Sequence, residues 1–282
     1  MNDLVARSLL IDGLETSYVE AGPADGPPVV LLHDGAWGGS AVISWSAVIP
    51  YLTDRYRVVA PDLLGFGRSA KAVRLDGGPY GFRIDHVVKL VDALGIDKPL
   101  HVVGASFGGS LALNMLPRHW RRIASVMSIS GTGGPWRTVF GRRILGTWDG
   151  TESGLRRVVE VLAEPSDEFD LDAHVAQRLA SARLPGHYRA MTAPGIELPE
   201  PLRTRNDAAE EWPSQLAGIP TPVVLVAGTR DGLVEPDWPS HLEKVLINCT
   251  VTWFDGLHSP NLDAPSYTAR LIEQTITSVG AR

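Results

Sequence analysis

A serine flanked by glycines is the strongest chemical signal in this chain. Ser106 is the centre of the sequence GASFG, which follows the apolar run Leu100–Val103 and precedes a helical pattern over Leu111–Leu116. Small residues on both sides permit a turn so tight that the serine hydroxyl is exposed at the end of the strand. The N-terminus of the following helix favours negative charge on the reacting oxygen. The spacing therefore predicts that Ser106 is a nucleophile.

A serine hydroxyl is a weak nucleophile unless a neighbouring base takes its proton. His258 is our candidate for this base, because it lies in the loop sequence GLHSP, after the β-like run Thr250–Phe254 and before the last helical pattern. From such a loop an imidazole can reach the edge of the sheet where Ser106 is expected. We expect His101 and His119 to be core or surface histidines.

An acid that orients the imidazole should follow an earlier strand. Asp231, in the sequence GTRDG, fits because it follows a valine-rich apolar run. Asp237, further along that loop, and Asp255, very near His258, are competing candidates. The chain order of serine, aspartate and histidine is one that catalytic triads use. We expect Ser106 to attack, His258 to transfer the proton and Asp231 to orient the imidazolium.

A developing oxyanion also needs hydrogen-bond donors. The sequence HDGA, residues 33–36, follows the apolar run Pro28–Leu32 and brings a turn with a glycine to the same region. We expect the backbone N–H groups of Gly35 and of Phe107, the residue after the nucleophile, to form the oxyanion hole. We expect His33 to tie down the loop.

Short apolar runs alternate with amphipathic helical patterns along most of the chain. Runs that are apolar on both faces are typical of strands buried in a parallel sheet. Helical patterns lie between them, for example Ile84–Leu94 with Gly95 as a stop, and a hairpin is predicted over Ser8–Ile11 and Thr16–Glu20. The predicted fold class is α/β, with a mostly parallel central sheet and helices on both faces. The predicted buried strands are Pro28–Leu32, Arg57–Ala60, Leu100–Val103, Ile123–Ile129, Pro222–Ala227 and Thr250–Phe254.

One long segment lacks the buried-strand pattern. From residue 132 to residue 212, apolar residues follow helical spacing, as at Leu155, Val158 and Leu162. We therefore predict a helical cap, or lid, over residues 132–212, inserted into a core formed by residues 1–131 and 213–282. Such a cap would cover the sheet edge at which ligands bind in open α/β folds.

Composition argues against several other classes of protein. With a net charge of −6, the protein lacks the excess of basic residues that a protein coating nucleic acid needs. No apolar stretch approaches the length of about 20 residues that spans a bilayer, and the first residues do not have the pattern of a secretory signal, so we expect a cytoplasmic location and no membrane partner. The single cysteine, Cys249, excludes an internal disulfide. The histidines are scattered and the sequence has no phosphate-binding loop motif, so we expect neither a metal nor a cofactor. We expect a small-molecule substrate.

Five segments together resemble the α/β-hydrolase superfamily over nearly the whole chain. They are HDG (33–35), PDLLGFGRS (61–69), GASFGG (104–109), GTRD (228–231) and GLHSP (256–260). Within that superfamily, the sequence HDGAWGGSAVISWSAVIPYL, residues 33–52, resembles the corresponding loop of the meta-cleavage-product hydrolases. This resemblance implies the α/β-hydrolase fold and a cofactor-independent serine hydrolase. It also implies cleavage of a C–C bond next to a ketone in a dienoate formed by aromatic ring fission.

The finer resemblance implies roles for individual residues. His258 would help to convert the dienol into its keto form, and Ser106 and water would then attack the ketone, through either an acyl-enzyme or a gem-diol. Enzymes of this family use an arginine of the cap to hold the acid end of the substrate. Arg178 is at a plausible position, because it is the one arginine of an apolar helical pattern that precedes Pro185 and Gly186, so it is our candidate for substrate binding.

Three positions differ from the family pattern and leave other functions open. Ala105 stands where the family usually has Asn, Ser259 stands where it often has Trp, and Asp34 places a carboxylate in the oxyanion turn. Ala105 and Ser259 favour the alternative of a carboxylesterase or lactonase that acts on a small apolar ester. A non-catalytic ligand-binding protein on the same fold is the third hypothesis, and the chain could form a homodimer.

Overall fold

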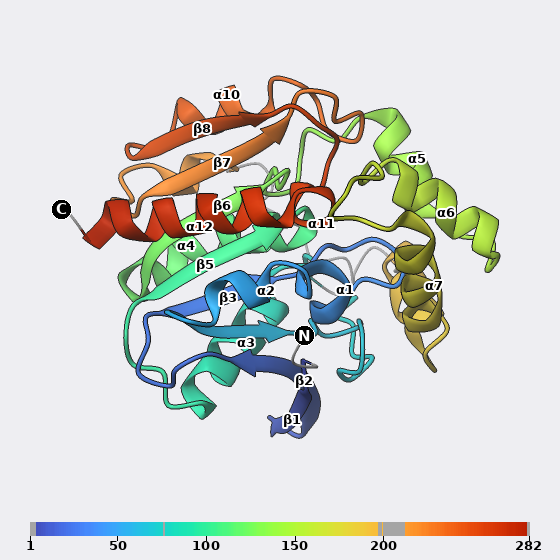
Figure 1. The fold of residues 1–282 in the computed structure, drawn as a ribbon, viewed down its shortest axis with the longest axis horizontal. Helices are drawn as coiled ribbons and strands as arrows, with labels where there is room; N and C mark the ends of the chain where they lie inside the picture. Colours follow the sequence, from blue (N-terminus) through green and yellow to red (C-terminus); the bar gives the residue numbers. More distant parts are fainter. Residues whose placement is uncertain (1–3, 76, 197–198, 200–211, 281–282) are drawn as a thin grey trace.

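The part of the chain that the computed structural model describes, residues 4–75, 77–196, 199 and 212–280, forms an eight-stranded sheet with helices on both faces (Figure 1). The strand order is β1-β2-β4-β3-β5-β6-β7-β8. β1 pairs antiparallel with β2 and β2 with β4, whereas every neighbouring pair from β4 to β8 is parallel. Each predicted strand, the hairpin included, is confirmed. The strands are β1 Ala6–Ile11, β2 Leu14–Ala21, β3 Pro28–Leu32, β4 Arg57–Pro61, β5 Leu100–Ala105, β6 Ile123–Ile129, β7 Val223–Gly228 and β8 Cys249–Phe254.

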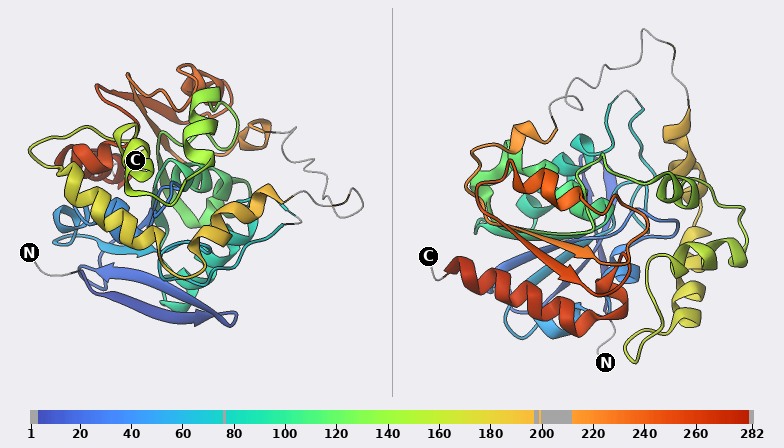
Figure 2. Two further views of the ribbon diagram at one scale, coloured as in Figure 1. Left: turned by 90° about the vertical axis from the view of Figure 1, so that its right-hand side faces the viewer. Right: turned by 90° about the horizontal axis from the view of Figure 1, so that it is seen from above.

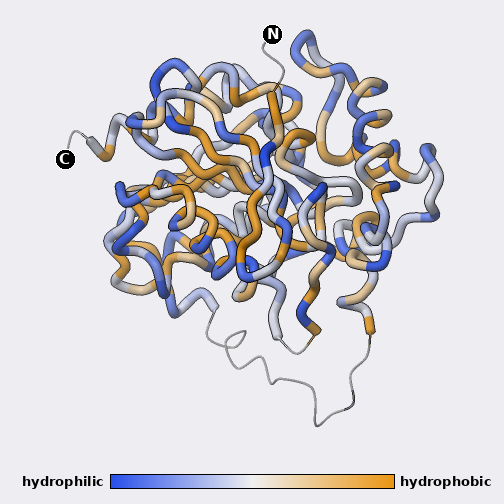
Figure 3. Tube along the Cα trace, turned by 90° about the horizontal axis from the view of Figure 1, so that it is seen from below, coloured by the Kyte–Doolittle hydropathy of each residue, from blue (hydrophilic) through white to orange (hydrophobic). Residues whose placement is uncertain are grey.

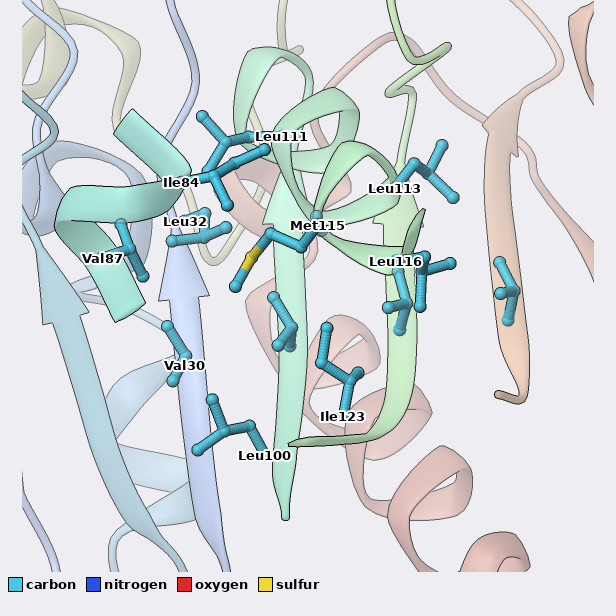
Figure 4. Close-up of a cluster of buried hydrophobic side chains, with 14 of the residues drawn as sticks. Val30, Leu32, Ile84, Val87, Leu100, Leu111, Leu113, Met115, Leu116 and Ile123 are labelled. Carbon is cyan, nitrogen blue, oxygen red and sulfur yellow. The ribbon is translucent and has the colours of Figure 1, made fainter. Parts of the chain in front are cut away.

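The two faces of the sheet are covered by different helices, because successive residues of a strand point to opposite sides. In β3, Val30 and Leu32 belong to the apolar cluster that includes residues of α3, α4 and α10, whereas Val29 and Leu31 belong to the cluster that includes residues of α1, α2 and α12. Figure 4 shows the first of these clusters, in which side chains of α3 and α4 lie against the strands. The helices of the two faces, with α11, are α1 Ala41–Trp45, α2 Ile49–Leu52, α3 Gly81–Ala93, α4 Phe107–His119, α10 Trp238–Glu243, α11 Pro260–Asp263 and α12 Pro265–Gly280.

The distribution of hydropathy along the chain agrees with this layered core. Figure 3 shows hydrophobic segments along the strands in the middle of the molecule and hydrophilic segments at many of the outer turns. Among the described helices, none combines the length and the apolar character that a membrane crossing requires. Helix α3 stops as expected, because Gly95 follows it with a positive φ of 65°.

Between β6 and β7 the chain forms helices that lie beyond the carboxyl ends of the central strands (Figures 1 and 2). They are α5 Val139–Gly146, α6 Glu152–Glu160, α7 Leu171–Ala182 and α8 His187–Thr192. The side chains of Thr138, Thr151 and Asp170 accept hydrogen bonds from the first turns of α5, α6 and α7, which satisfies N–H groups that a helix leaves unpaired. The helical spacing predicted here is confirmed, and the division of the chain into a core and a lid stays a prediction. Residues 197–198 and 200–211 of the predicted lid lie outside the described residues.

We predict that shortening a side chain between α4 and the sheet destabilises the fold. Leu111 is fully buried in this layer, so Leu111→Ala leaves a cavity and should lower the free energy of unfolding by about 2–5 kcal/mol. Urea unfolding measures this loss. Val139→Ala is the control, because Val139 is 75% exposed and its truncation should change stability by about 0.5 kcal/mol or less. Equal unfolding midpoints for the two variants would contradict the packing described here.

Candidate active site

Ser106 lies in the turn between β5 and α4, where the backbone is strained. Its φ is 53° and its ψ is −111°, a conformation that residues with a side chain rarely adopt. The turn depends on glycine on both sides: a Cβ on Gly104 would lie 2.1 Å from the carbonyl oxygen of Gly108, and a Cβ on Gly108 would lie 2.1 Å from that of Leu32. The Ser106 N–H donates to the carbonyl of Ile129 at 2.7 Å. The predicted strand–turn–helix setting of Ser106 is therefore present.

His258 lies in the loop between β8 and α11 and reaches the hydroxyl of Ser106. The distance between His258 Nε2 and Ser106 Oγ is 2.8 Å, and His258 Nδ1 lies 2.7 Å from Oδ2 of Asp231. A carboxylate can only accept, so Nδ1 carries the proton in the neutral imidazole, and Nε2 accepts from the serine hydroxyl. The neighbouring Ser259 fixes this loop, because its N–H donates to the carbonyl of Leu162 at 2.8 Å. The imidazole is therefore held in the orientation that a base for Ser106 needs.

Asp231 follows β7 and is the carboxylate that meets His258. Burial alone would raise the pKa of Asp231, but the charge and hydrogen bond of His258 and the N–H of Leu233 hold it below its usual value. The carboxyl group is therefore ionised at neutral pH and favours an imidazolium beside it. The two competing acids lie elsewhere: the side chain of Asp255 is 93% exposed near Arg230, and Asp237 is close to His241.

The loop that carries Gly35 lies directly against the turn of Ser106. A Cβ on Gly35 would be 2.7 Å from Cβ of Phe107, so the two backbones approach closely. Within the described residues, the N–H groups of Gly35 and Phe107 donate no hydrogen bond. His33 ties down this loop as expected: its Nε2 accepts from the Leu63 N–H at 2.9 Å, and its Nδ1 donates to the carbonyl of Asp34 at 2.6 Å. Burial lowers the pKa of His33, so the imidazole is neutral at neutral pH and can make both contacts.

A cavity of about 1000 Å³ opens above this turn. Ser106, Gly35 and Phe107 line it together. The apolar side chains of its wall come from segments that precede β5 and from the segment between β6 and β7. They include Trp37, Phe66, Tyr80, Leu145, Met191 and Trp212. Within the described residues, no three His, Cys, Asp or Glu side chains are grouped so that they could hold a metal ion. The chemistry available at this cavity is therefore a serine hydroxyl with an adjacent base and two adjacent N–H donors.

Arg178 does not have the surroundings expected for a substrate-binding residue. Its side chain on α7 is fully buried and is not part of the cavity wall. Both Nη atoms bind Asp34, at 3.1 and 2.9 Å, Nη1 also donates to the carbonyl of Trp37, and Nε donates to His174. Its guanidinium is therefore already bound by a protein carboxylate, and the expected contact of Arg178 with substrate stays a prediction.

Asp34 is the residue whose role the sequence did not reveal. Besides Arg178, its carboxylate accepts from the hydroxyl of Ser44 at 2.7 Å and from the N–H of Ala36 at 2.9 Å. Burial would raise the pKa of Asp34, but the charge and hydrogen bonds of Arg178 hold it far below its usual value. Asp34 thus joins the loop of Gly35 to helix α7. The only sign of this ion pair in the sequence was a carboxylate in the turn of Gly35 together with a single arginine in the apolar pattern of α7.

We predict that Arg178 stabilises the fold through Asp34. Arg178→Met leaves a buried carboxylate without its cation and should lower the free energy of unfolding by about 3–5 kcal/mol. In the double variant with Asp34→Asn, the uncompensated charge is removed, so part of the loss should be recovered. The control is Arg156→Met, because Arg156 pairs with the exposed Asp172 and its loss should cost about 1 kcal/mol or less. Chemical unfolding of the four proteins, wild type included, measures these differences, and wild-type stability of Arg178→Met would disprove the role of the pair.

The sequence and the fold both match known hydrolases. Residues 27–265 match the family described as alpha/beta hydrolase fold. The chain is 27% identical over 254 residues to 2-hydroxy-6-oxo-2,4-heptadienoate hydrolase of Pseudomonas putida strain F1, covering 87% of this chain and 86% of that one. It is 29% identical over 231 residues to 2-hydroxy-6-oxo-6-(2'-aminophenyl)hexa-2,4-dienoic acid hydrolase of Metapseudomonas resinovorans, covering 82% and 76%. A relative from Caulobacter sp. strain K31 with a provisional carbamate hydrolase name is 30% identical over 264 residues, covering 92% and 94%.

A solved structure shows the same architecture. The 2-hydroxy-6-oxo-6-phenylhexa-2,4-dienoate hydrolase from Rhodococcus sp. strain RHA1 superimposes with a TM-score of 0.83 at 23% identity, covering 98% of this chain and 99% of that one. At this identity the likeness concerns the fold. Together with the family match over most of the chain, it identifies the protein as a member of the α/β-hydrolase family, an α/β-fold hydrolase that resembles the C–C bond hydrolases.

Proposed function

We propose that this protein hydrolyses a C–C bond next to a ketone in a ring-fission-type dienoate, with Ser106, His258 and Asp231 as its catalytic triad and without a cofactor. The observation that carries the proposal is the 2.8 Å contact of Ser106 with His258, continued by the 2.7 Å contact of His258 with Asp231. The names of two relatives supply the substrate class, because both are called hydrolases of 2-hydroxy-6-oxo-dienoic acids.

The first step is a proton shift within the substrate. Moving the proton of the 2-hydroxyl group to C5 converts the dienol into a ketone and makes the fragment on the C5 side a stable leaving group. His258, which contacts Ser106 at the cavity wall, is the group that can carry this proton, and the ionised Asp231 stabilises the imidazolium while it does so. The net change is a tautomerisation, so no bond between heavy atoms breaks.

The second step is attack on the C6 ketone. Either Ser106 adds to the carbonyl carbon and gives its proton to His258, or His258 takes the proton of a water that adds directly. The N–H groups of Gly35 and Phe107 then bind the developing oxyanion. The C5–C6 bond breaks, its electron pair passes into the dienolate, and His258 returns the proton. In the first route water then hydrolyses the acyl-enzyme, whereas in the second route the water has already been added. In both routes the products are a carboxylic acid and a 2-hydroxydienoate.

A carboxylesterase or lactonase is the second candidate function, because it needs the same hydroxyl, base and oxyanion donors. Ala105 and Ser259 favour it, since the C–C hydrolases usually have Asn and often have Trp at these positions. Both residues are almost fully buried beside the triad. The cytoplasmic location and the homodimer stay predictions from the sequence.

We predict that the wild-type protein removes the visible chromophore of dienolate substrates and that Ser106→Ala does not. Loss of the Ser106 hydroxyl should lower kcat by about 10³-fold or more, because it breaks the triad and closes the covalent route, although His258 and the oxyanion donors remain. Absorbance decay with several ring-fission products measures this. Ser278→Ala is the matched control, since Ser278 lies near the end of α12 and should keep full activity.

Other outcomes separate the candidate functions. Turnover of p-nitrophenyl acyl esters without any loss of the dienolate chromophore would replace the C–C proposal by the esterase. Failure of a fluorophosphonate to label Ser106 would favour the non-catalytic ligand-binding protein. Full activity of Ser106→Ala would refute the triad itself. Circular dichroism of each variant shows whether it is folded.

A further inference from the structure

A second buried arginine, Arg83 on α3, lines the same cavity as Ser106. Its exposed fraction is 7%. Nε donates to the carbonyl of Leu64 at 2.9 Å, and Nη1 donates to the carbonyl of Pro79 at 2.7 Å. The guanidinium carbon lies 5.4 Å from the ring centre of Phe107. These contacts fix the guanidinium in one position at the cavity wall.

Arg83 lacks the anionic partner that a buried cation normally has. Within the described residues no carboxylate forms an ion pair with it, and Nη2 donates no hydrogen bond. Burial lowers the pKa of Arg83 to about 10, so it is still a cation at neutral pH. A buried charge without a counter-charge is costly. Arg178, which is also buried, has Asp34 as its partner.

Nη2 lies close to a second residue of the cavity wall. A Cβ on Gly65 would lie 3.3 Å from Nη2, and both Gly65 and Arg83 line the cavity. Phe107 separates the guanidinium from the turn of Ser106, because its ring contacts Arg83 while its backbone N–H adjoins the nucleophile. An anion at Nη2 and a carbonyl at Ser106 can therefore belong to one small molecule.

Other arginines also line the cavity. The charged residues that line the cavity are Arg74, Arg83, Arg118, Arg137, Arg142 and Asp85. Among the described residues of the wall, Asp85 is the acidic one, and it is paired with Arg118. Arginine charge at a cavity wall attracts an anionic substrate.

We propose that Arg83 binds the carboxylate of the substrate through Nη2 and thereby selects acids whose carboxylate is several bonds away from the reacting carbonyl. The inference rests on the proposed function, because a 2-hydroxy-6-oxo-dienoate carries its carboxylate at C1 and its reacting ketone at C6. It assigns to Arg83 the contact that Arg178 cannot make while it holds Asp34. A single charged N–H···O bond from Nη2 is the expected geometry, since Nε and Nη1 already have carbonyl partners.

The test compares an acid with its neutral amide, by calorimetry on the Ser106→Ala protein. The probes are hexa-2,4-dienoate and hexa-2,4-dienamide, which have the same carbon chain. A charge-assisted hydrogen bond contributes about 1.5–3 kcal/mol, so we expect the acid to bind about 10- to 100-fold more tightly. Adding Arg83→Met should abolish this preference and leave the affinity for the amide unchanged. Adding Arg142→Met, the same change at another cavity arginine, should keep most of it.

Each further outcome decides the question. A preference for the acid that survives Arg83→Met, or equal binding of acid and amide before that change, would overturn the proposal. A parallel loss of affinity for both probes would show a merely structural Arg83. Arg83→Gln, which keeps a donor for the Leu64 carbonyl, serves the same comparison if the Met variant does not fold. Binding is measured on a protein that does not turn over the probes. Failure of the proposal on Arg83 is therefore seen in the binding data, whereas failure of the proposed function is seen in the cleavage assay.

Discussion

The close approach of three backbone segments around Ser106 is the constraint on which the rest of the site depends. Glycine at 104 and at 108 lets β5, the start of α4 and the end of β3 meet at distances that a Cβ would forbid. This contact forces the positive φ of the serine and brings the loop of Gly35 next to Phe107. The strain is offset by the apolar layer between α4 and the sheet, which fixes the helix on the strands.

The parallel sheet brings the other two members of the triad to the same point. Asp231 follows β7 and His258 follows β8, and parallel pairing places both loops at the carboxyl edge beside the end of β5. Residues 152 positions apart, Ser106 and His258, thus meet at hydrogen-bond distance. Asp255 is nearer to His258 in sequence, yet its side chain is exposed to solvent and lies near Thr229 and Arg230.

Much of the fold and the centre of the site could be predicted, since both depend on local patterns. Apolar runs such as those of β3 and β6 show buried strands, and GASFG shows a turn that only small residues permit. The partners of buried charges could not be predicted in this way, because they depend on where distant segments meet. Nothing local to Arg178 reveals that Asp34 lies beside it, and nothing in the pattern of α3 shows that Arg83 reaches the cavity of Ser106.

The two buried arginines have different roles because their surroundings differ. The charge of Arg178 is balanced by Asp34, and the pair joins helix α7 to the loop of the oxyanion donors. An arginine paired in this way positions a loop but has little attraction left for a second carboxylate. Within the described residues, Arg83 has carbonyl oxygens and aromatic rings as partners but no carboxylate, so a net charge remains at the cavity wall. The carboxylate of Asp34 in the oxyanion turn therefore neutralises Arg178. Arg83, which has no such counter-charge, is then the arginine at which an anionic substrate gains the most binding energy.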